Sequence, residues 1–358
     1  MPSMRAPMQI VATSALRGSR RITAAELDTA YGRPEGTTLA RSGVSERWWA
    51  SDDETSSTLA ARAVRTVLAA AGWEVADLDA LIVTAAVPEQ PIPTTAVLTL
   101  GHLGYAGGAL EAYDVNATCL SFLNGLDLAA TKVAAGQWHR VVVVAVDLAS
   151  KGLNHDDIES SALFGDGAAA VALAPPSMPG SRAESSSEGA GEGGEPGPEA
   201  GGTAGPGVLA TRFETYPTGA RLCEIPAGGT RFNVFNPPDQ ALDYAFRMDG
   251  MGVIRLAARH LPRFIDELLA EAGLTRAELD VVVPHQTSGL GMKYLKAKLG
   301  FDPAQVIDIL DDHGNQVAAS LPSALDAAVQ AGRLPAGSTA LLIGTGAGLV
   351  IGGMVVRL

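Results

Sequence analysis

Hydrophobic residues follow two patterns along this chain. Short continuous apolar runs occur at 79–84, 140–146 and 280–284, and such runs are typical of strands that are buried on both faces of a parallel sheet. Other segments carry apolar residues at three- and four-residue spacing, which predicts amphipathic helices. Strands and helices that alternate in this way predict an α/β fold. The predicted helices are 58–71, 94–103, 120–133, 242–272, 288–299 and 318–331.

Weaker patterns complete this outline. Shorter apolar stretches predict further strands at 8–16, 165–173 and 306–309. The C-terminal segment 338–358 reads as two strands around a glycine turn. The segment 17–57 is polar, and we expect it to be irregular.

An internal repeat suggests two similar halves. Residues 71–83 and 272–283 share a helix-ending glycine, a Leu-Asp pair and an apolar strand at one constant offset, which predicts a duplicated α/β unit. The segment 175–207 is rich in Gly, Pro, Ser and Glu and has almost no large apolar side chain, so we predict that it is a mobile surface insertion. The predicted organisation is an N-terminal half, an insertion and a C-terminal half, at 1–174, 175–207 and 208–358.

Composition and charge exclude several classes of function. The 358 residues carry a formal net charge of −13, which argues against a nucleic-acid partner because phosphates need a basic face. A small acidic carrier protein could still bind a local basic patch. The two cysteines, Cys119 and Cys223, and the spacing of the six histidines fit neither a disulfide framework nor a metal site. No apolar run near the N-terminus is long enough for a signal peptide or a membrane span, which predicts a cytoplasmic protein without a membrane partner.

Cys119 is the first candidate catalytic residue. It lies directly before the predicted helix 120–133, which Asn116 or Thr118 can cap. Unpaired amides and the macrodipole at a helix start stabilise a thiolate, so this position favours a nucleophile. The alternative is a small core cysteine, because free cysteines are often buried.

Two more polar residues could act with this thiol. His285 directly follows the predicted strand 280–284, and Asn315 lies in a polar turn before the next helix. A cysteine nucleophile with a histidine and an amide forms a constellation for acyl transfer, in which His285 and Asn315 could hydrogen-bond an enolate-like oxygen. Singly, His285 could be structural, Asn315 could be a helix cap, and His313 is a competing histidine. The glycine-rich stretch 344–348 would let backbone amides approach a ligand closely.

These stretches together resemble the 3-oxoacyl-acyl-carrier-protein synthase III-type ketosynthases of the thiolase superfamily. The matching stretches occur in the family's order and span nearly the whole chain apart from the insertion. They are Asn116-Ala-Thr-Cys119-Leu-Ser-Phe, Ala162-Leu-Phe-Gly-Asp-Gly-Ala-Ala169, Val283-Pro-His285-Gln, His313-Gly-Asn315 through Ser320, and Gly344 to the C-terminus. The resemblance implies a five-layered α/β/α/β/α sandwich of two duplicated halves that acts as a homodimer.

The resemblance also implies roles for individual residues. Cys119 would carry the acyl group, and the amides of Cys119 and Ala347 would form the oxyanion hole. His285 and Asn315 would bind the carbonyl of a second, malonyl-type thioester for a Claisen condensation without a metal or redox cofactor. The acyl donor would be an acyl-CoA or an acyl carrier protein. Substrate binding would fall to Arg41, Ile92, Ser288 and Gly346, and carrier docking to Arg255, Lys296 and Lys298.

Some positions depart from the family's pattern. Thr37 stands where members that use coenzyme A have a tryptophan, Ser288 replaces a frequent asparagine, and Leu290 replaces an arginine implicated in carrier docking. These departures argue against ordinary acetyl-CoA priming of fatty-acid synthesis. Ile92, at the position of a partner-subunit residue that limits the acyl pocket, suggests an acyl group larger than acetyl.

Three alternatives accompany the prediction of a ketosynthase of specialised metabolism. The head-to-head condensing branch carries a glutamate near the position of Ile92. Ile92 is not a glutamate, and Glu89 would need a shifted loop, so that branch is less favoured. An acyltransferase that uses an oxygen or nitrogen acceptor often has Asp at the position of Asn315. A non-catalytic partner subunit would need none of Cys119, His285 and Asn315. Cys223 is interpreted as structural.

Overall fold

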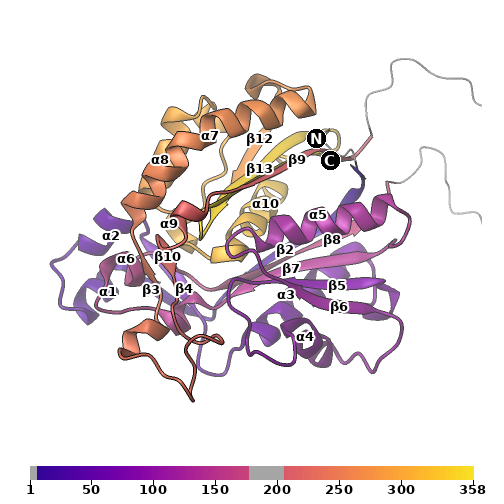
Figure 1. Cartoon of the computed structure of the whole chain (residues 1–358). Helices are drawn as coiled ribbons and strands as arrows, with labels where there is room; N and C mark the ends of the chain where they lie inside the picture. Colours follow the sequence, from indigo (N-terminus) through magenta and orange to yellow (C-terminus); the bar gives the residue numbers. More distant parts are fainter. Residues whose placement is uncertain (1–5, 177–204) are drawn as a thin grey trace, which may run out of the picture.

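The computed structural model describes residues 6–176 and 205–358, so most of the predicted insertion lies outside the described residues. Two five-stranded mixed sheets form the framework (Figure 1). The first has the order β2-β8-β7-β5-β6, with bounds β2 (Gln9–Arg17), β5 (Ala80–Thr84), β6 (Glu111–Val115), β7 (Val141–Asp147) and β8 (Gly167–Ala174). The second has the order β1-β9-β14-β13-β12, with bounds β1 (Ala6–Pro7), β9 (Gly207–Thr215), β12 (Val281–Pro284), β13 (Thr339–Gly346) and β14 (Val350–Arg357).

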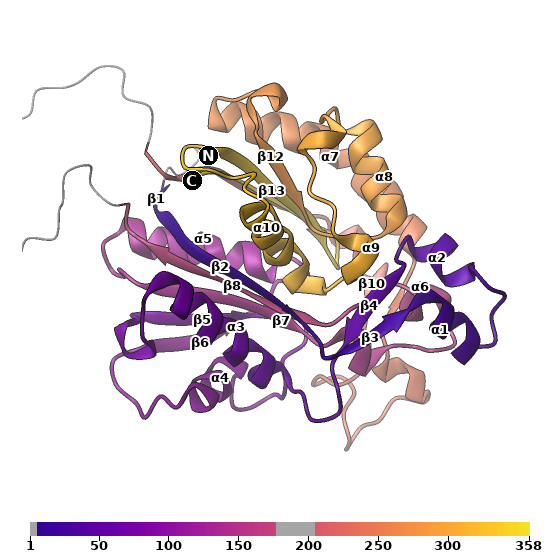
Figure 2. The same cartoon turned by 180° about the vertical axis from the view of Figure 1, so that it is seen from behind.

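Helices separate and cover the two sheets, which produces five layers (Figures 1 and 2). Between the sheets lie α5 (Ser121–Ala134) and α10 (Ser320–Gln330). The first sheet is covered on its outer face by α3 (Ser56–Ala71) and α4 (Thr95–Leu103), and the second by α7 (Gly250–Ala272) and α8 (Gly289–Lys298). The order α/β/α/β/α agrees with the predicted thiolase-like sandwich.

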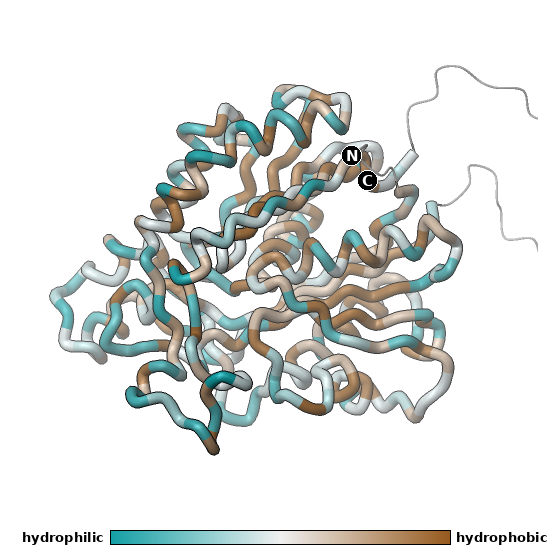
Figure 3. The backbone as a smooth tube through the Cα atoms, in the orientation of Figure 1, coloured by the Kyte–Doolittle hydropathy of each residue, from teal (hydrophilic) through white to brown (hydrophobic). Residues whose placement is uncertain are grey.

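The strand β7 shows why the sequence produces layers. Its residues alternate between the central core, which includes Val143, and the outer core, which includes Val142 and Val144. Both faces of the strand are buried, so every position along it is apolar until Asp147. Figure 3 shows hydrophobic residues concentrated along the strands and hydrophilic residues along the outer surface of α7.

The two sheets repeat one local arrangement. The helices α3 and α7 both end at a glycine in the left-handed region, Gly72 with φ 68° and Gly273 with φ 69°. Each is followed by a short 3-10 turn and then by a buried strand that pairs in parallel with a neighbour. A glycine at this position ends a helix without the steric cost of a Cβ atom. The repeat read from the sequence therefore corresponds to repeated structure.

Two predicted elements of the second half differ from the structure. The helix predicted at 242–272 begins only at Gly250, because Asp249 caps it by accepting the N–H of Gly252 at 2.7 Å. The segment before it forms a 3-10 turn and the short strand β11 (Arg247–Met248), which pairs with β10 (Cys223–Glu224). The predicted strand 306–309 is only an isolated bridge between Val306 and Val282.

The polar segment 17–57 is not irregular. It contains the antiparallel pair β3 (Arg20–Thr23) and β4 (Glu46–Trp49), with the helices α1 (Ala24–Ala30) and α2 (Thr37–Ser42) between the two strands. Two further short helices, α6 (Ile158–Ser161) and α9 (Leu310–His313), lie near this part of the chain.

Within the described ranges, no helix is both long enough and apolar enough to cross a membrane.

Candidate active site

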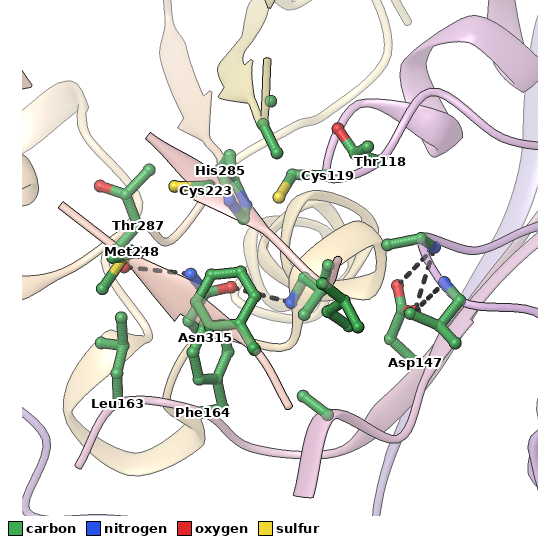
Figure 4. Close-up of a pocket in the computed structure, with 18 of the residues that line it drawn as sticks. Thr118, Cys119, Asp147, Leu163, Phe164, Cys223, Met248, His285, Thr287 and Asn315 are labelled. Atoms are coloured by element: carbon green, nitrogen blue, oxygen red, sulfur yellow. Dashed lines mark hydrogen bonds between the residues drawn. The ribbon is translucent and has the colours of Figure 1, made fainter. Parts of the chain in front are cut away.

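A cavity of about 1010 Å³ lies where the two halves meet. The first half contributes Cys119 and Asp147 to its lining, and the second contributes His285, Asn315 and Ala347. Figure 4 shows Cys119, His285 and Asn315 around the same space. Three residues that were predicted from separate stretches of sequence are therefore brought together.

A tight turn presents Cys119 to the cavity. Thr118, the preceding residue, has a φ of 54°, which is rare for a residue with a side chain. The Asn116 carboxamide oxygen supports the turn by accepting the N–H of Thr118 at 2.9 Å, and the Ser121 hydroxyl accepts the N–H of Ala117 at 2.9 Å. The predicted cap is wrong, because Leu120 is the N-cap of α5 and no side chain caps this helix. The side chain of Asn116 holds the turn instead.

The electrostatics of the thiol also differ from the prediction. Burial raises the pKa of Cys119 to about 12, and the neighbouring Asp147 and Cys223 add to this effect. The backbone N–H groups of Ala347 and of Cys119 itself donate to the sulfur, which lowers the pKa, but burial outweighs them. The expectation of a stabilised thiolate is therefore wrong for the free protein, because it considered the helix start without the surrounding core.

The same two amides bear on the predicted oxyanion hole. The N–H groups of Cys119 and Ala347 point at the sulfur, so a carbonyl oxygen bonded next to that sulfur would lie within their reach. This geometry is compatible with the role that the resemblance implies, and the role itself stays a prediction.

His285 follows β12 and is almost completely buried, with 3% of its surface exposed. Its backbone N–H donates to the carbonyl of Ile343 at 2.8 Å, which fixes it beside β13. Burial lowers the pKa of His285 to about 4, so the ring is neutral near pH 7. Its Nδ1 has no partner among the described residues.

The amide of Asn315 is oriented by three hydrogen bonds. Its oxygen accepts the N–H of Val317 at 2.8 Å and the hydroxyl of Ser320 at 3.3 Å. Its nitrogen donates to the carbonyl of Thr287 at 3.1 Å. Because the oxygen is occupied by donors, the nitrogen must be the group that serves the cavity, and within the described residues its second N–H has no acceptor. Asn315 can therefore donate to a substrate oxygen.

The competing histidine, His313, does not line the cavity. Its Nε2 accepts the Nε–H of Arg17 at 3.1 Å, and its Nδ1 lies 2.7 Å from a carboxylate oxygen of Asp312. Both ring nitrogens are occupied by these contacts, so His313 serves the structure around α9.

The glycines of β13 also allow close packing of the site residues. A Cβ on Gly346 would lie 2.8 Å from the hydroxyl of Thr118, and one on Gly344 would lie 2.8 Å from the Cβ of His285. These glycines let the Cys119 turn and His285 pack directly against the strand. Both still line the cavity, as do Ser288 and Ala347. Ser288 also caps α8 by accepting the N–H of Gly291 at 3.2 Å.

Other predicted binding residues lie outside the cavity. Arg41 is exposed at the end of α2, and 85% of the surface of Ile92 is exposed. Among the residues predicted for carrier docking, Lys298 is exposed, Lys296 forms an ion pair with Asp308 at 2.7 Å, and Arg255 lies 3.9 Å from Asp249.

Two cavity residues were missed or misplaced by the sequence reasoning. Cys223, expected to be structural, lines the cavity from β10, and burial raises its pKa to about 12. Asp147 was overlooked, although a polar residue that ends a buried run of valines is the same signal that identified His285. Among the described residues, no group of three or more His, Cys, Asp or Glu side chains could hold a metal ion.

Comparisons with known proteins identify the family of this chain. A family model described as 3-oxoacyl-[acyl-carrier-protein (ACP)] synthase III matches residues 113–190, and a model for the C terminal of the same enzyme matches 269–358. The chain is 34% identical over 343 residues to the acetoacetyl CoA synthase NphT7 of Streptomyces sp. (strain CL190), with 95% of each chain covered. The chain belongs to the 3-oxoacyl-[acyl-carrier-protein] synthase III family.

Other relatives support the family and its fold. The beta-ketoacyl-[acyl-carrier-protein] synthase III of Bordetella petrii is 34% identical over 320 residues, which cover 89% of this chain and 87% of that protein. The solved priming β-ketosynthase of the R1128 polyketide pathway is 27% identical, with a TM-score of 0.83, and covers 100% of this chain and 98% of its own. The corresponding synthase III from Aquifex aeolicus VF5 is 25% identical, with a TM-score of 0.80, and covers 98% of this chain and 100% of its own. This member of the family is thus an acyl-transferring condensing enzyme, as the sequence predicted.

Proposed function

We propose that this ketosynthase holds an acyl group as a thioester on Cys119 and condenses it with a malonyl-type thioester. The product is a 3-oxoacyl thioester, and the carboxyl group of the malonyl unit leaves as carbon dioxide. The observation that carries this proposal is the meeting of Cys119, His285 and Asn315 in one apolar cavity between the halves. Such a set supplies a nucleophile and two hydrogen-bond donors in a site sheltered from water.

The acylation step begins with a neutral thiol. Its proton must leave as the sulfur attacks the donor thioester, because a thiol with a pKa of about 12 does not ionise beforehand. That proton can pass to the sulfur of the donor thioester as its C–S bond breaks, so this step does not require His285 as a base. The donor's thiol then leaves with a proton, so the charge of the site is restored.

The condensation step uses the same donors differently. Neutral His285 with its proton on Nε2 and the N–H of Asn315 would bind the carbonyl oxygen of the malonyl thioester. Loss of carbon dioxide leaves an enolate, whose charge these donors stabilise. The enolate carbon attacks the carbonyl carbon on Cys119, and the amides of Cys119 and Ala347 would bind the resulting oxyanion. Its collapse breaks the C–S bond and releases Cys119 as a thiolate, which takes up a proton from solvent and returns to the neutral thiol.

Intact-mass measurement tests the two steps separately. Incubation with a panel of acyl-CoA and acyl-carrier donors is expected to add one acyl group, and Cys119→Ala is expected to abolish the adduct. His285→Ala and Asn315→Ala are expected to keep the adduct while the 3-oxoacyl product falls by about 100-fold or more. If no donor of the panel gave an adduct with the wild type, the proposal of an acyl-enzyme on Cys119 would be refuted. Unchanged product formation in either variant would refute the role of the replaced residue.

The substrates of this chain are proposed to be larger than acetyl. The cavity is large and lined mainly by apolar side chains, among them Phe164, Phe246 and Met248. Ile92 is smaller than phenylalanine and would leave room for a longer acyl chain. The R1128 priming ketosynthase supports a role in specialised metabolism, and the name of NphT7 supports a coenzyme A thioester as one substrate.

The same proposal includes a cytoplasmic homodimer. The loop with Ile92 presents an apolar side chain with 85% of its surface exposed, and β6 is an edge strand of its sheet. Both features are typical of surfaces that a second copy covers. Cys119 and Cys223 are free thiols, which a reducing compartment preserves. Light scattering of the wild type and of Ile92→Glu tests the dimer, and an unchanged mass would contradict this interface.

Arg41 would contact the coenzyme A phosphates, and Arg255, Lys296 and Lys298 would bind an acidic carrier protein.

A further inference from the structure

One buried carboxylate joins the two halves beside the cavity. Asp147 ends β7, and only 2% of its surface is exposed. Its Oδ1 accepts the N–H groups of Ala86 and Val87 at 3.0 and 3.3 Å (Figure 4). Its Oδ2 accepts the N–H of Ala318 at 3.0 Å. Ala86 and Val87 follow β5 of the first sheet, whereas Ala318 belongs to a 3-10 turn that leads into α10.

The contact of Asp147 with Ala86 is connected by further hydrogen bonds to the turn of Cys119. The carbonyl of Ala86 accepts the side-chain N–H of Asn116 at 3.0 Å. The carboxamide oxygen of Asn116 accepts the N–H of Thr118, which sits in the left-handed region directly before Cys119. The position of Ala86 is thereby transmitted to the turn that carries the thiol.

The contact of Asp147 with Ala318 is connected through Val317 to the side chain of Asn315. Ala318 follows Val317, whose φ is 53°, again rare for a residue with a side chain. The N–H of Val317 donates to the oxygen of Asn315, which orients the amide. An anchor at Ala318 therefore holds the segment that fixes Asn315.

We propose that Asp147 is a positioning residue for the condensation: its carboxylate holds the turn of Cys119 and the turn of Asn315 in register with each other. This inference rests on the proposed function of the same site. The two turns come from different halves, and the carboxylate bonds to the backbone of both sides at once. A displacement of about 1 Å between reacting groups can slow a reaction about 100-fold, so such an anchor matters for rate.

The negative charge of Asp147 changes the reactivity of Cys119, and an anchor that acted only through its shape would not have this effect. Its negative charge raises the pKa of Cys119. The other titratable groups around the thiol are Cys223 from β10 and His285 after β12. The negative charge of Asp166 raises the pKa of Asp147. Burial raises the pKa of Asp147 itself to about 7, so the carboxylate is mainly charged at pH 8 and mainly neutral at pH 5.5.

The decisive comparison is Asp147→Asn against Asp79→Asn. Asparagine keeps the shape of the side chain, but it removes the charge and directs an NH₂ group at an N–H that needs an acceptor. Asp79 is the matched control, because it accepts the N–H groups of His139 and Arg140 at 2.5 and 3.0 Å before β7, away from the cavity. Both variants should be compared at equal folded fraction, checked by thermal unfolding.

For Asp147→Asn we expect condensation to fall by about 10- to 100-fold. Alkylation of Cys119 by iodoacetamide at pH 8 should become about tenfold faster, because a like charge no longer disfavours the thiolate. At pH 5.5 the alkylation rates of variant and wild type should converge. Asp79→Asn should change neither property.

Two results would overturn the role of Asp147. One is condensation within twofold of the wild type in Asp147→Asn. The other is an equal loss in both variants with no change in alkylation at pH 8, which would indicate general loss of packing. A wild-type enzyme that is acylated but forms no 3-oxoacyl product would instead contradict the proposed function, which is a separate result.

Discussion

The thiol of Cys119 is protonated in the free enzyme, because burial and the neighbouring Asp147 outweigh the two amides that donate to the sulfur. A neutral thiol beside a neutral histidine is a weak nucleophile. This state protects the thiol from oxidants and alkylating agents, which react with thiolates. In the proposed reaction, attack begins when the substrate places its carbonyl beside the two amides.

The pH dependence of alkylation tests this state directly. With a pKa of about 12, the thiolate fraction of Cys119 should rise about tenfold per pH unit between pH 7 and pH 9 without a plateau. Iodoacetamide labelling with peptide mapping measures this rate and separates Cys119 from Cys223. A plateau below pH 8 would contradict the prediction and would restore the thiolate that the helix start led us to expect.

His285 should make stability depend on pH in a defined direction. Its pKa falls from 6.5 in the unfolded chain to about 4 in the fold, so the unfolded chain binds the proton more tightly. Stability is therefore lost as pH falls from about 6.5 toward 4, by roughly 3 kcal/mol at pH 4. Asp147 acts in the opposite direction over the same range, because its pKa is raised.

The difference between wild type and His285→Asn isolates the histidine, since Asp147 titrates in both. Urea unfolding at pH 8 and pH 4 should show a stability advantage of the wild type that shrinks by roughly 3 kcal/mol at the lower pH. A difference that does not change with pH would show that His285 keeps an ordinary pKa in the fold.

That Cys119 and His285 line one cavity could be predicted, whereas their electrostatics could not. Cys119 and His285 each stand next to a strongly patterned helix or strand, so their positions are local properties of the sequence. The pKa of Cys119 depends on Asp147 and Cys223, which are distant in sequence. The position of Asp147 at the end of a buried run could have been noticed, but its contacts to Ala86 and Ala318 exist only in the fold.

At the scale of elements, the strand β13 is the surface on which the site is assembled. A Cβ on Gly344 would lie 2.8 Å from the Cβ of His285 and 3.0 Å from a methyl group of Leu120. Leu120 is the N-cap of α5 and follows the nucleophile. Gly344 pairs with Gly352 of β14, where a Cβ would also meet Leu120 at 3.0 Å. Two glycines thus leave the space in which the helix of Cys119 meets the second sheet.

Gly344→Ala should therefore disturb the histidine and the nucleophile together. We expect a loss of about 1–3 kcal/mol in stability, as for an overpacked core, and about 100-fold slower condensation. Gly101→Ala in α4 is the control, because a Cβ there meets nothing within 4 Å. It should keep full activity and gain up to about 1 kcal/mol in stability. Full activity in Gly344→Ala would show that the strand can yield without moving the site.

Elements with one strong period were predictable, and elements that depend on partners were not. The strands β5 and β7 are buried on both faces and read as apolar runs. The pair β3 and β4 is rich in arginine and tryptophan, and its Arg47 is buried through bonds to the carbonyls of Val44 and Ala162. A buried arginine looks polar in the sequence, so the segment 17–57 was expected to be irregular.

At the scale of the whole molecule, duplication places the chemistry between two similar units. In the proposed reaction, the first half supplies the nucleophile, Cys119, and the second supplies the donors for the other substrate, His285 and Asn315. The central helices α5 and α10 pack against one another's sheets in one common core, so neither half can bury its inner face alone. Asp147 is bonded to both sides of this junction.

The chain between the two halves leaves and returns at neighbouring points. Ala174, the last residue of β8, pairs with Gln9, and Gly207, the first residue of β9, pairs with Pro7. Because Pro7 and Gln9 are two residues apart, Ala174 and Gly207 are no more than about 17 Å apart. A connection of about ten residues is long enough to bridge them.

Replacing residues 177–204 by a Gly-Ser linker of about six residues should therefore preserve the fold and the activity. Shortening the connection reduces the entropy of loop closure, so stability should stay equal or rise by less than about 1 kcal/mol. Acylation of Cys119 and product formation should remain within about twofold of the wild type.

A variant with residues 177–204 in scrambled order is the matched control, because it keeps length and composition. If the shortened chain folds but loses condensation while the scrambled chain keeps it, length matters for substrate delivery. If both lose condensation, the order of these residues contributes to the reaction, and the prediction of a dispensable insertion is wrong.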